Sequence, residues 1–432
     1  MYSIFRRSSL LAPLLCSLIF LAGAYTLYTV LQLSSYRLEQ GNHAAHSGST
    51  RTPTPTPASM FQTSCPTTGQ ARAAVMLHSK SGRRQNLVYT YNSKDAGQLL
   101  RYDVGNGQTT MIASINNATI SNAQLSADGQ FVLFASQVAD RLAIQLVRVD
   151  GQELQTLYCA PENGAAINFI DNLLWSHDQQ SIVFREPDPT HAPVAPIIKL
   201  LRVKSGQVET VLVPEAHTGY IPRAWLDNTR VYLQGYSTNV GEAPQDVYLL
   251  DTRNGTTKRV ASIQGYEWDL CPTTKGNELL LSQSASIPQE DEPLPPGLIS
   301  AQPATGGRIH VVYASHVHAV TQVRSISAQT ILFVQGGRFA SGEQDGLWKI
   351  NRDGSGLTLL TKDGKILSDQ HTAWSSVSRN GRLYAVIGYD YTPATGKLLT
   401  HVLYGALNGG PTTLVATAQT GETSEIVGWT VA

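Results

Sequence analysis

The 432-residue chain has few charged residues. Asp, Glu, Lys and Arg make up only 15% of it, and 32 acidic residues balance 32 basic ones. A net charge of zero gives no electrostatic reason to expect a nucleic acid partner. The sequence also lacks GxSxG, GxGxxG and GxxxxGK[ST] motifs. We therefore find no support for a serine hydrolase elbow or for a glycine-rich loop that binds phosphate.

Cysteine is scarce as well. The chain contains Cys16, Cys65, Cys159 and Cys271, and none belongs to a CxxC pair. This spacing argues against a structural zinc site. Cys16 lies in a hydrophobic segment. A disulfide between two of the other three fits an oxidising compartment, but their spacing does not identify the pair.

The N-terminal region differs from the rest of the chain. Residues 10–33 are uncharged and mostly apolar, which is long enough for a helix to cross a bilayer. Arg6 and Arg7, in the short tail 1–9, favour a cytoplasmic N-terminus, so the rest of the protein is expected outside the cytoplasm. Cleavage after Ala22-Gly23-Ala24 is the alternative. Residues 34–70 are rich in Pro, Thr and Ser and predict an extended linker.

Residues 71–432 repeat a phrase of strand, polar turn and strand, with little helical periodicity. LSADGQFVLF, WSHDQQSIVF and WLDNTRVYLQ begin at residues 125, 175 and 225, so 50 residues separate consecutive copies. Seven further hairpins have a Gly-containing turn, which supplies the positive φ of a tight turn; they lie at 99–113, 145–158, 200–213, 247–261, 298–312, 346–360 and 401–416. Two hairpins per repeat make a four-stranded unit, which is typical of a propeller blade.

The predicted fold is therefore an all-β, seven-bladed β-propeller, with an N-terminal transmembrane helix before it. Six or eight blades are the alternatives, because residues 73–79 also resemble a strand. The chain ends with EIVGWTVA, a first strand without the rest of its blade, and we expect this strand to close the ring. Trp175, Trp225, Trp348 and Trp374 are expected to pack between blades.

Two phrases carry a family resemblance. SADGQFVLF and WSHDQQSIVF resemble the aromatic-SPDG-apolar phrase of TolB-like propellers, which are tryptophan–aspartate-type β-propeller repeats. GLWKINRDGSGLTLLT, at 346–361, resembles their Asp-Gly-Ser-Gly hairpin. The resemblance covers residues 85–432, although WLDNTR and CPTTKGN keep only its hydrophobic rhythm. It implies the fold rather than an activity, since that family includes both a periplasmic envelope component and propellers attached to peptidases.

Long connections on one face of the propeller are the predicted binding surface, because loops on a rigid scaffold often carry function. They lie at 185–196, 236–245, 286–297, 336–346 and 389–397. The residues expected on this binding face are Glu186, Tyr236, Tyr266, Glu267, Arg338, Tyr389, Asp390 and Tyr391.

Metal binding and carboxylate catalysis are weaker interpretations. His217, His316, His318 and His371 lie in or near connections between blades, and several imidazoles that met at the axis would suit zinc or copper. Separate, solvated histidines are the simpler interpretation, and no cofactor is expected. Glycoside cleavage needs two carboxyl groups about 5–10 Å apart, for which Glu186, Glu267 and Asp390 are the candidates.

The sequence thus predicts a membrane-tethered, extracytoplasmic propeller with a monomeric head. Because no catalytic constellation is recognisable, a binding or scaffolding role is favoured over an enzymatic one. The expected partner is an envelope protein, a peptide or a glycan. The alternative is a propeller hydrolase or lyase that acts on polysaccharide through axial carboxylates or a metal.

Overall fold

The computed structural model describes residues 62–67, 69–78, 85–139, 141–161, 169–187, 196–215, 218–237, 245–263, 267–284, 296–337, 345–392 and 396–430. All of them belong to one compact unit, Ser59–Ala432. No helix in these ranges is long and apolar enough to cross a membrane. The predicted tail, the predicted anchor and most of the predicted linker lie outside them.

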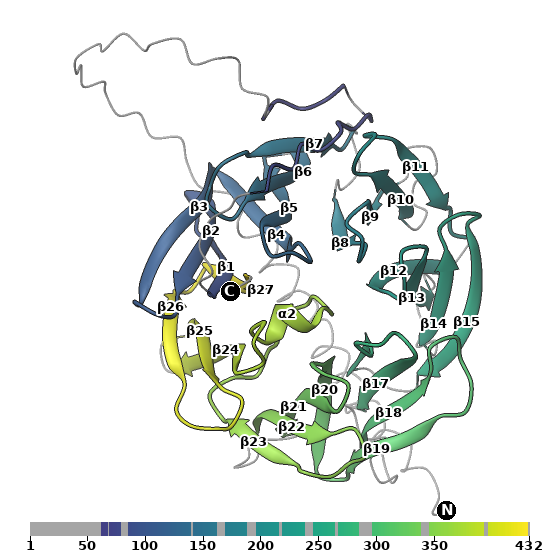
Figure 1. The fold of residues 1–432 in the computed structure, drawn as a ribbon, viewed down its shortest axis with the longest axis vertical. Helices are drawn as coiled ribbons and strands as arrows, with labels where there is room; N and C mark the ends of the chain where they lie inside the picture. Colours follow the sequence, from purple (N-terminus) through teal and green to yellow (C-terminus); the bar gives the residue numbers. More distant parts are fainter. Residues whose placement is uncertain are drawn as a thin grey trace, which may run out of the picture. The chain divides into compact units, whose positions relative to one another are not determined.

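The described strands form seven antiparallel sheets around a central axis, so this part of the chain is an all-β, seven-bladed propeller (Figure 1). From the axis outwards, blade 1 contains β27 (Thr423–Trp429), β1 (Asn86–Asn92), β2 (Ala96–Asp103) and β3 (Gln108–Asn116). Blade 2 contains β4 (Ala118–Leu125), β5 (Phe131–Val138), β6 (Arg141–Arg148) and β7 (Gln155–Cys159). Blade 3 contains β8 (Asp171–Trp175), β9 (Ser181–Glu186), β10 (Ile197–Arg202) and β11 (Val208–Leu212).

The other four blades continue around the ring in chain order. Blade 4 contains β12 (Thr218–Trp225), β13 (Arg230–Ser237), β14 (Gln245–Asp251) and β15 (Thr256–Ile263). Blade 5 contains β16 (Glu267–Pro272), β17 (Glu278–Ser284), β18 (Gly297–Pro303) and β19 (His310–Ser315). Blade 6 contains β20 (His318–Ser325), β21 (Thr330–Gly337), β22 (Gly346–Asn351) and β23 (Thr358–Thr361). Blade 7 contains only β24 (Leu383–Thr392), β25 (Lys397–Ala406) and β26 (Thr413–Ala418), and α2 (Ala373–Ser376) precedes it.

The ring closes as predicted. β27 pairs antiparallel with β1, so the last strand of the chain becomes the innermost strand of the first blade. At the end of this pair, the backbone N–H of Asn86 donates to the Thr430 hydroxyl at 3.0 Å. All seven predicted hairpins are present. Residues 73–78 do not start an eighth blade, since they form no strand and the one bridge beside them, Ala71 to Tyr158, is isolated.

The repeated polar phrase is a side-chain-stabilised turn. The Ser126 hydroxyl accepts hydrogen bonds from the backbone N–H groups of Gln130 at 3.1 Å and Phe131 at 3.0 Å. Ser176 accepts the N–H of Ser181 at 3.0 Å in the same way, and Ser378 accepts that of Leu383 at 2.9 Å. The phrase recurs because each copy closes the turn between the first two strands of a unit and satisfies its backbone donors.

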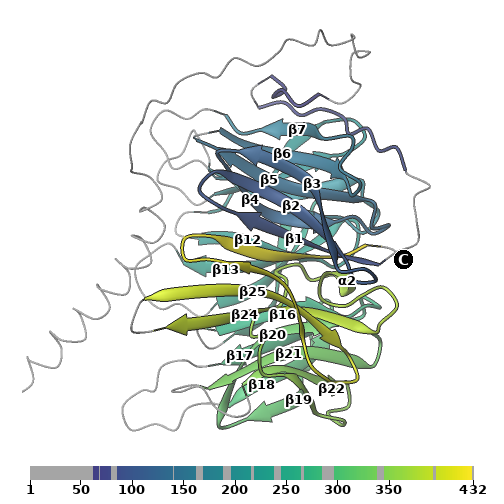
Figure 2. The same cartoon turned by 90° about the vertical axis from the view of Figure 1, so that its left-hand side faces the viewer.

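The apolar residues of the strands form seven clusters of buried side chains, one at each interface between neighbouring blades. Figure 2 shows the sheets stacked face against face around the ring. Trp175 and Trp225 are buried in these clusters, and Trp348 and Trp374 pack against them partly buried, as expected. The indole N–H of Trp225 donates to the Leu174 carbonyl at 3.1 Å, across the interface of blades 3 and 4.

A segment before the first blade is joined covalently to blade 2. The disulfide, whose pairing the sequence left open, links Cys65 to Cys159 in β7. The segment then runs along blades 2 and 3: the backbone N–H of Arg72 donates to the Leu157 carbonyl at 2.7 Å, and that of Ala74 donates to the Val203 carbonyl at 2.8 Å. It therefore bridges two neighbouring blades at their outer edge. The remaining described cysteine, Cys271, is buried and free.

Blade 7 corrects one expectation. A regular first strand was expected before the turn at Ser378, but residues 365–377 are mostly irregular and include the short helix α2, which lies inside the ring (Figure 1). Their backbone pairs with β24 only at two isolated bridges, Ile366 to Ile387 and Val377 to Tyr384. The residues between these bridges are held by other blades, as described next, and this is why the strand does not form.

Candidate ligand site at the propeller axis

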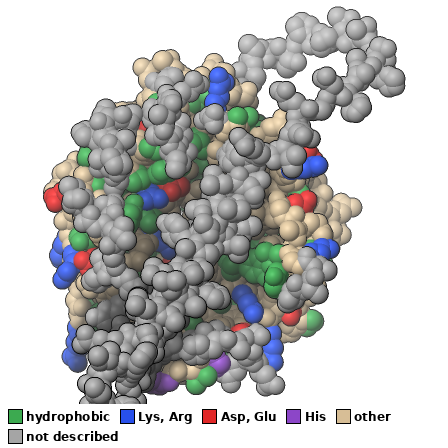
Figure 3. Space-filling model, turned by 180° about the vertical axis from the view of Figure 1, so that it is seen from behind, with side chains coloured by type: hydrophobic (Ala, Val, Ile, Leu, Met, Phe, Trp, Pro, Cys, Tyr) green, Lys and Arg blue, Asp and Glu red, His purple; other side chains and the backbone are tan. Residues whose placement is uncertain are grey.

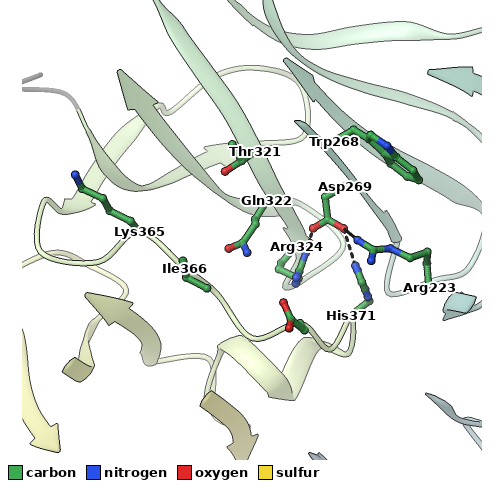
Figure 4. Close-up of a pocket in the computed structure, with 10 residues that line it drawn as sticks. Arg223, Trp268, Asp269, Thr321, Gln322, Arg324, Lys365, Ile366 and His371 are labelled. Atoms are coloured by element: carbon green, nitrogen blue, oxygen red, sulfur yellow. Dashed lines mark hydrogen bonds and ion pairs between the residues drawn. The ribbon is translucent and has the colours of Figure 1, made fainter. Parts of the chain in front are cut away.

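Two adjoining pockets lie among the innermost strands and share Gln322, Ile366 and Asp369. The first pocket has a volume of about 330 Å³ and is lined by Arg223, Trp268, Asp269, Thr321, Gln322, Arg324, Lys365, Ile366, Asp369 and His371 (Figure 4). The second pocket has a volume of about 360 Å³ and is lined by Ser121, Asn122, Ala123, Gln322, Ile366, Leu367, Ser368, Asp369, Gln370, Ile387, Tyr389, Ser424, Glu425 and Ile426. Each is large enough for a small ligand.

Irregular pairing in the innermost strands presents several of these side chains. The register shifts between Pro222 and Ala224 in β12 and between Val320 and Val323 in β20. The residues inside these shifts are Arg223, Thr321 and Gln322, which line the first pocket. A bulge turns a side chain away from the regular alternation of a strand, so these polar groups face the axis and not the cores between blades.

Asp269 is the centre of a buried ionic cluster in the first pocket. Its carboxylate accepts a hydrogen bond from Nε2 of His371 at 2.8 Å, pairs with Nη1 of Arg324, and lies 3.5 Å from Nη2 of Arg223. Arg324 also donates from Nη2 to the Ser368 carbonyl at 2.6 Å. The cluster therefore ties the irregular segment before β24 to β16 and β20, as the dashed lines of Figure 4 show in part.

Charges and burial fix the protonation states in this cluster. Burial alone would raise the pKa of Asp269, but the positive charge of Arg324 and the hydrogen bond from His371 outweigh it and hold the pKa well below its usual range. Burial, assisted by the charge of Arg324, lowers the pKa of His371. His371 is therefore neutral near pH 7, donates from Nε2 to Asp269, and keeps Nδ1 as an acceptor.

Two buried polar atoms of the first pocket have no partner in the described part of the chain: Nδ1 of His371 and Nε of Arg223. The His371 side chain is only 6% exposed. The Arg223 guanidinium lies 5.8 Å from the ring centre of Trp268. Because buried polar groups in folded proteins are normally hydrogen-bonded, these two atoms leave binding capacity for a ligand or for water.

The second pocket has an acidic wall. Glu425 of β27 and Tyr389 of β24 line it together with Asp369. Glu425 borders the open space but is otherwise surrounded by protein; this poor solvation, together with the negative charge of Asp369, raises its pKa to about 7. The same surroundings raise the pKa of Tyr389. No Lys or Arg is among the described residues that line this pocket.

The structure separates the predicted binding-face residues. Tyr389 is 41% exposed and lines the second pocket. Asp390 is mostly exposed and lies 3.0 Å from Nε2 of His401, while Tyr391 is 62% exposed. The hydroxyl of Tyr236 is 3.5 Å from Nη1 of Arg185. Only Tyr389 of these four lines an axial pocket.

Glu186 does not lie on an exposed surface. Its side chain is buried at the interface of blades 2 and 3, where it pairs with Lys199 and accepts the Tyr158 hydroxyl at 2.7 Å. A carboxylate in this position is stabilised by its two partners and stabilises the packing of the blades. Tyr266 and Arg338 lie outside the described residues, and Glu267 is described only as the first backbone position of β16.

The candidate histidines are also separated. His371 lines the first axial pocket, whereas His316 and His318 lie where β19 passes into β20, and His217 is outside the described residues. Within the described ranges, no group of three or more His, Cys, Asp or Glu residues is placed to hold a metal ion. Most of the predicted long connections fall outside these ranges. On the face shown in Figure 3, the described hydrophobic, basic and acidic side chains are interspersed.

Sequence reasoning missed Arg223, Asp269 and Arg324. Each is a charged residue inside a first strand, in IPRAWL, EWDLCP and TQVRSIS, where alternation suggested ordinary packing. A charge just before the polar turn, in three successive units, is the signal that was available. It was not sufficient, because sequence alone does not show that the three strands face one axis.

No family model matches this chain, and no curated protein matches it. Solved structures similar to it include TolB from Acinetobacter baumannii, with 15% sequence identity and a TM-score of 0.42. The match covers 63% of this chain and 62% of that protein, so the chain spans less than two thirds of its length. A TolB candidate from Agrobacterium tumefaciens has 11% identity and a TM-score of 0.41, with 80% and 98% covered. An oligogalacturonate lyase in complex with manganese has 11% identity and a TM-score of 0.49, also with 80% and 98% covered. TolB and TolB-like structures are thus among those similar to this chain, as the resemblance in the sequence predicted. The propeller fold itself is shown by the seven sheets of this chain.

Proposed function

We propose that this chain is an extracytoplasmic binding module, tethered to a membrane by residues 10–33, whose axial pockets receive part of a protein, peptide or glycan partner. The observation that carries the binding role is the pair of unpartnered buried atoms, Nε of Arg223 and Nδ1 of His371, on the walls of one 330 Å³ pocket. A partner that supplied an acceptor and a donor there would satisfy both atoms.

The disulfide supports a location outside the cytoplasm. Disulfides persist in oxidising compartments and are rare in the cytosol, and Cys65–Cys159 joins the end of the predicted linker to blade 2. A linker fixed at this point would hold the propeller at a defined place on its tether. Deletion of residues 10–33 should move the protein from the membrane fraction to the soluble fraction; unchanged sedimentation would reject the tether.

Binding is tested with the full chain in detergent micelles and a library of envelope peptides and glycans. Arg223→Ala should abolish binding of an axial ligand, whereas Arg253→Ala should not, because Arg253 is 66% exposed and pairs only with Asp251 in the turn between β14 and β15. A library without any ligand that depends on Arg223 would reject an axial binding site.

A polysaccharide hydrolase or lyase is the second candidate, and the Asp269–His371 pair favours it. A neutral imidazole oriented by a carboxylate is a recognised general base, and Nδ1 of His371 is unoccupied by other described residues. Incubation with glucans, uronic-acid polymers and peptidoglycan should then produce new reducing ends. Their absence with all three substrates would leave only the binding role.

A further inference from the structure

The two axial pockets differ in charge, and we propose that together they bind a zwitterionic ligand, an amino acid or a short peptide. The carboxylate of the ligand occupies the first pocket beside Arg223, and its ammonium group occupies the second pocket beside Asp369 and Glu425. The inference rests on the proposed binding role and specifies the ligand class of the same site.

The two arginines of the first pocket differ in their available donors. Arg324 is saturated, because it binds Asp269 and the backbone carbonyls of Val323 and Ser368. Arg223 approaches Asp269 only at 3.5 Å, and its Nε has no partner in the described part of the chain. A carboxylate accepts two parallel hydrogen bonds from a guanidinium group, so Arg223 offers the geometry for one.

Lys365 adds a second cation to this pocket. Its side chain is 46% exposed and lies 3.9 Å from Asp345, a long separation for an ion pair. Asp269 and Arg324 neutralise each other, and the two cations Arg223 and Lys365 then outnumber the one remaining carboxylate, Asp369. The net charge of the first pocket is therefore positive. This pocket therefore favours the anionic end of a ligand.

The second pocket has the opposite charge. Asp369 borders both pockets and Glu425 lines the second, and neither forms an ion pair with any described residue. Burial raises the pKa of Glu425 most, and repulsion from the Asp369 carboxylate raises it further. An ammonium group between them would remove the repulsion, so this pocket favours the cationic end of a ligand.

The combination excludes simpler ligand classes. A simple anion would satisfy Arg223 and leave both carboxylates without a counter-charge, and a simple amine would do the reverse. A neutral sugar carries no charge to pair with Arg223 or with the two carboxylates. His371 adds a third feature, because its buried Nδ1 can accept an N–H of an amino acid or peptide.

The test is calorimetric titration of the full chain in detergent micelles. The probes are glycine, glycylglycine and triglycine, which have increasing distances between their charges, together with N-acetylglycine, glycinamide and galacturonate. At least one zwitterion should bind. Removing either charge from it should weaken binding about tenfold or more, as expected for the loss of one charge-assisted pair.

Variants assign each charge to its pocket. The N-acetylated analogue lacks the ammonium group, so Glu425→Gln should reduce the ratio of zwitterion affinity to N-acetyl analogue affinity. The amide lacks the carboxylate, so Arg223→Ala should reduce the ratio of zwitterion affinity to amide affinity. Arg253→Ala is the control for Arg223, and Glu209→Gln, an exposed carboxylate paired with Arg202, is the control for Glu425. Melting temperatures establish that all four variants remain folded.

The outcomes separate this inference from the proposed function. If galacturonate or N-acetylglycine binds as tightly as any zwitterion, the zwitterion inference is overturned and an axial anion site remains. If no probe binds but a library ligand depends on Arg223, the inference also falls while the binding role stands. If nothing tested depends on Arg223, both are rejected.

Discussion

Blades 6 and 7 differ at their innermost position. In blade 6, β20 pairs with β21 along most of its length, from His318–Gly337 to Ser325–Ile331. In blade 7, residues 365–377 take the same place but their backbone pairs with β24 only at two isolated bridges. The three outer strands of each blade pair continuously in one antiparallel sheet, so the difference in pairing lies at the innermost position.

This difference shows where the molecule departs from its repeat in order to build a site. The backbone groups that blade 7 does not pair in a sheet are satisfied by side chains of blade 6. The N–H of Leu367 donates to Oε1 of Gln322 at 2.6 Å, and the Ser368 carbonyl accepts Nη2 of Arg324 at 2.6 Å. Released from the sheet, the segment places Asp369 and His371 in the axial pockets.

The largest expected effect comes from Arg324→Met, which removes the anchor of this segment. Asp269 would stay buried without its main counter-charge, and breaking a buried ion pair costs about 3–5 kcal/mol of unfolding free energy. Arg324→Met should also abolish axial ligand binding. Both quantities are measured by urea denaturation and by calorimetry.

Lys199→Met is the matched control, because it breaks the buried pair of Lys199 with Glu186 between the paired strands β10 and β9 of blade 3. It should also destabilise the protein but leave axial binding unchanged. Equal loss of binding in both variants would mean that the irregular segment has no special role.

A medium effect is expected from pH through His371. The pKa of His371 is lowered in the folded state, so folding favours the neutral imidazole. The contribution of His371 to the free energy of unfolding is therefore fully present above about pH 6.5 and is lost as the pH falls. Asp269, Arg324 and Arg223 are the charged groups that face it. The stability difference between the wild type and His371→Gln should therefore shrink between about pH 7.5 and pH 5, with a slope of at most about 1.4 kcal/mol per pH unit. A difference that is constant over this range would contradict a neutral, buried His371.

The comparison also explains what the sequence could predict. The hairpins and the polar turns depend on local chemistry, such as the Ser126 hydroxyl and the glycines of the tight turns, so the blades and the closing strand were predictable. The axial cluster depends on contacts such as Asp269 with Arg324 and His371, which are 55 and 102 residues away in sequence. Irregular residues 365–377 follow from these contacts and not from their own sequence, which reads as one more strand. The same holds for the Cys65–Cys159 pair, since three cysteines allow more than one connection.

The smallest expected effect concerns Glu425, which lies in β27, the innermost strand of the neighbouring blade 1. Its folded-state pKa is raised to about 7, so the folded protein favours the protonated carboxyl, and stability falls as pH rises from its ordinary pKa of about 4.3 through 7. Glu425→Gln removes this penalty and should stabilise the protein at pH 8 by less than about 1 kcal/mol, because the side chain borders open solvent and its charge is screened. At pH 3.5 the variant and the wild type should be about equally stable, because the carboxyl is then protonated in both the folded and the unfolded state. Glu209→Gln, at a carboxylate that is 39% exposed and pairs with Arg202, is the control substitution. Stabilisation by Glu425→Gln that is the same at both pH values would mean that the folded-state pKa of Glu425 is not raised, so that neither burial nor the charge of Asp369 disfavours its ionised form.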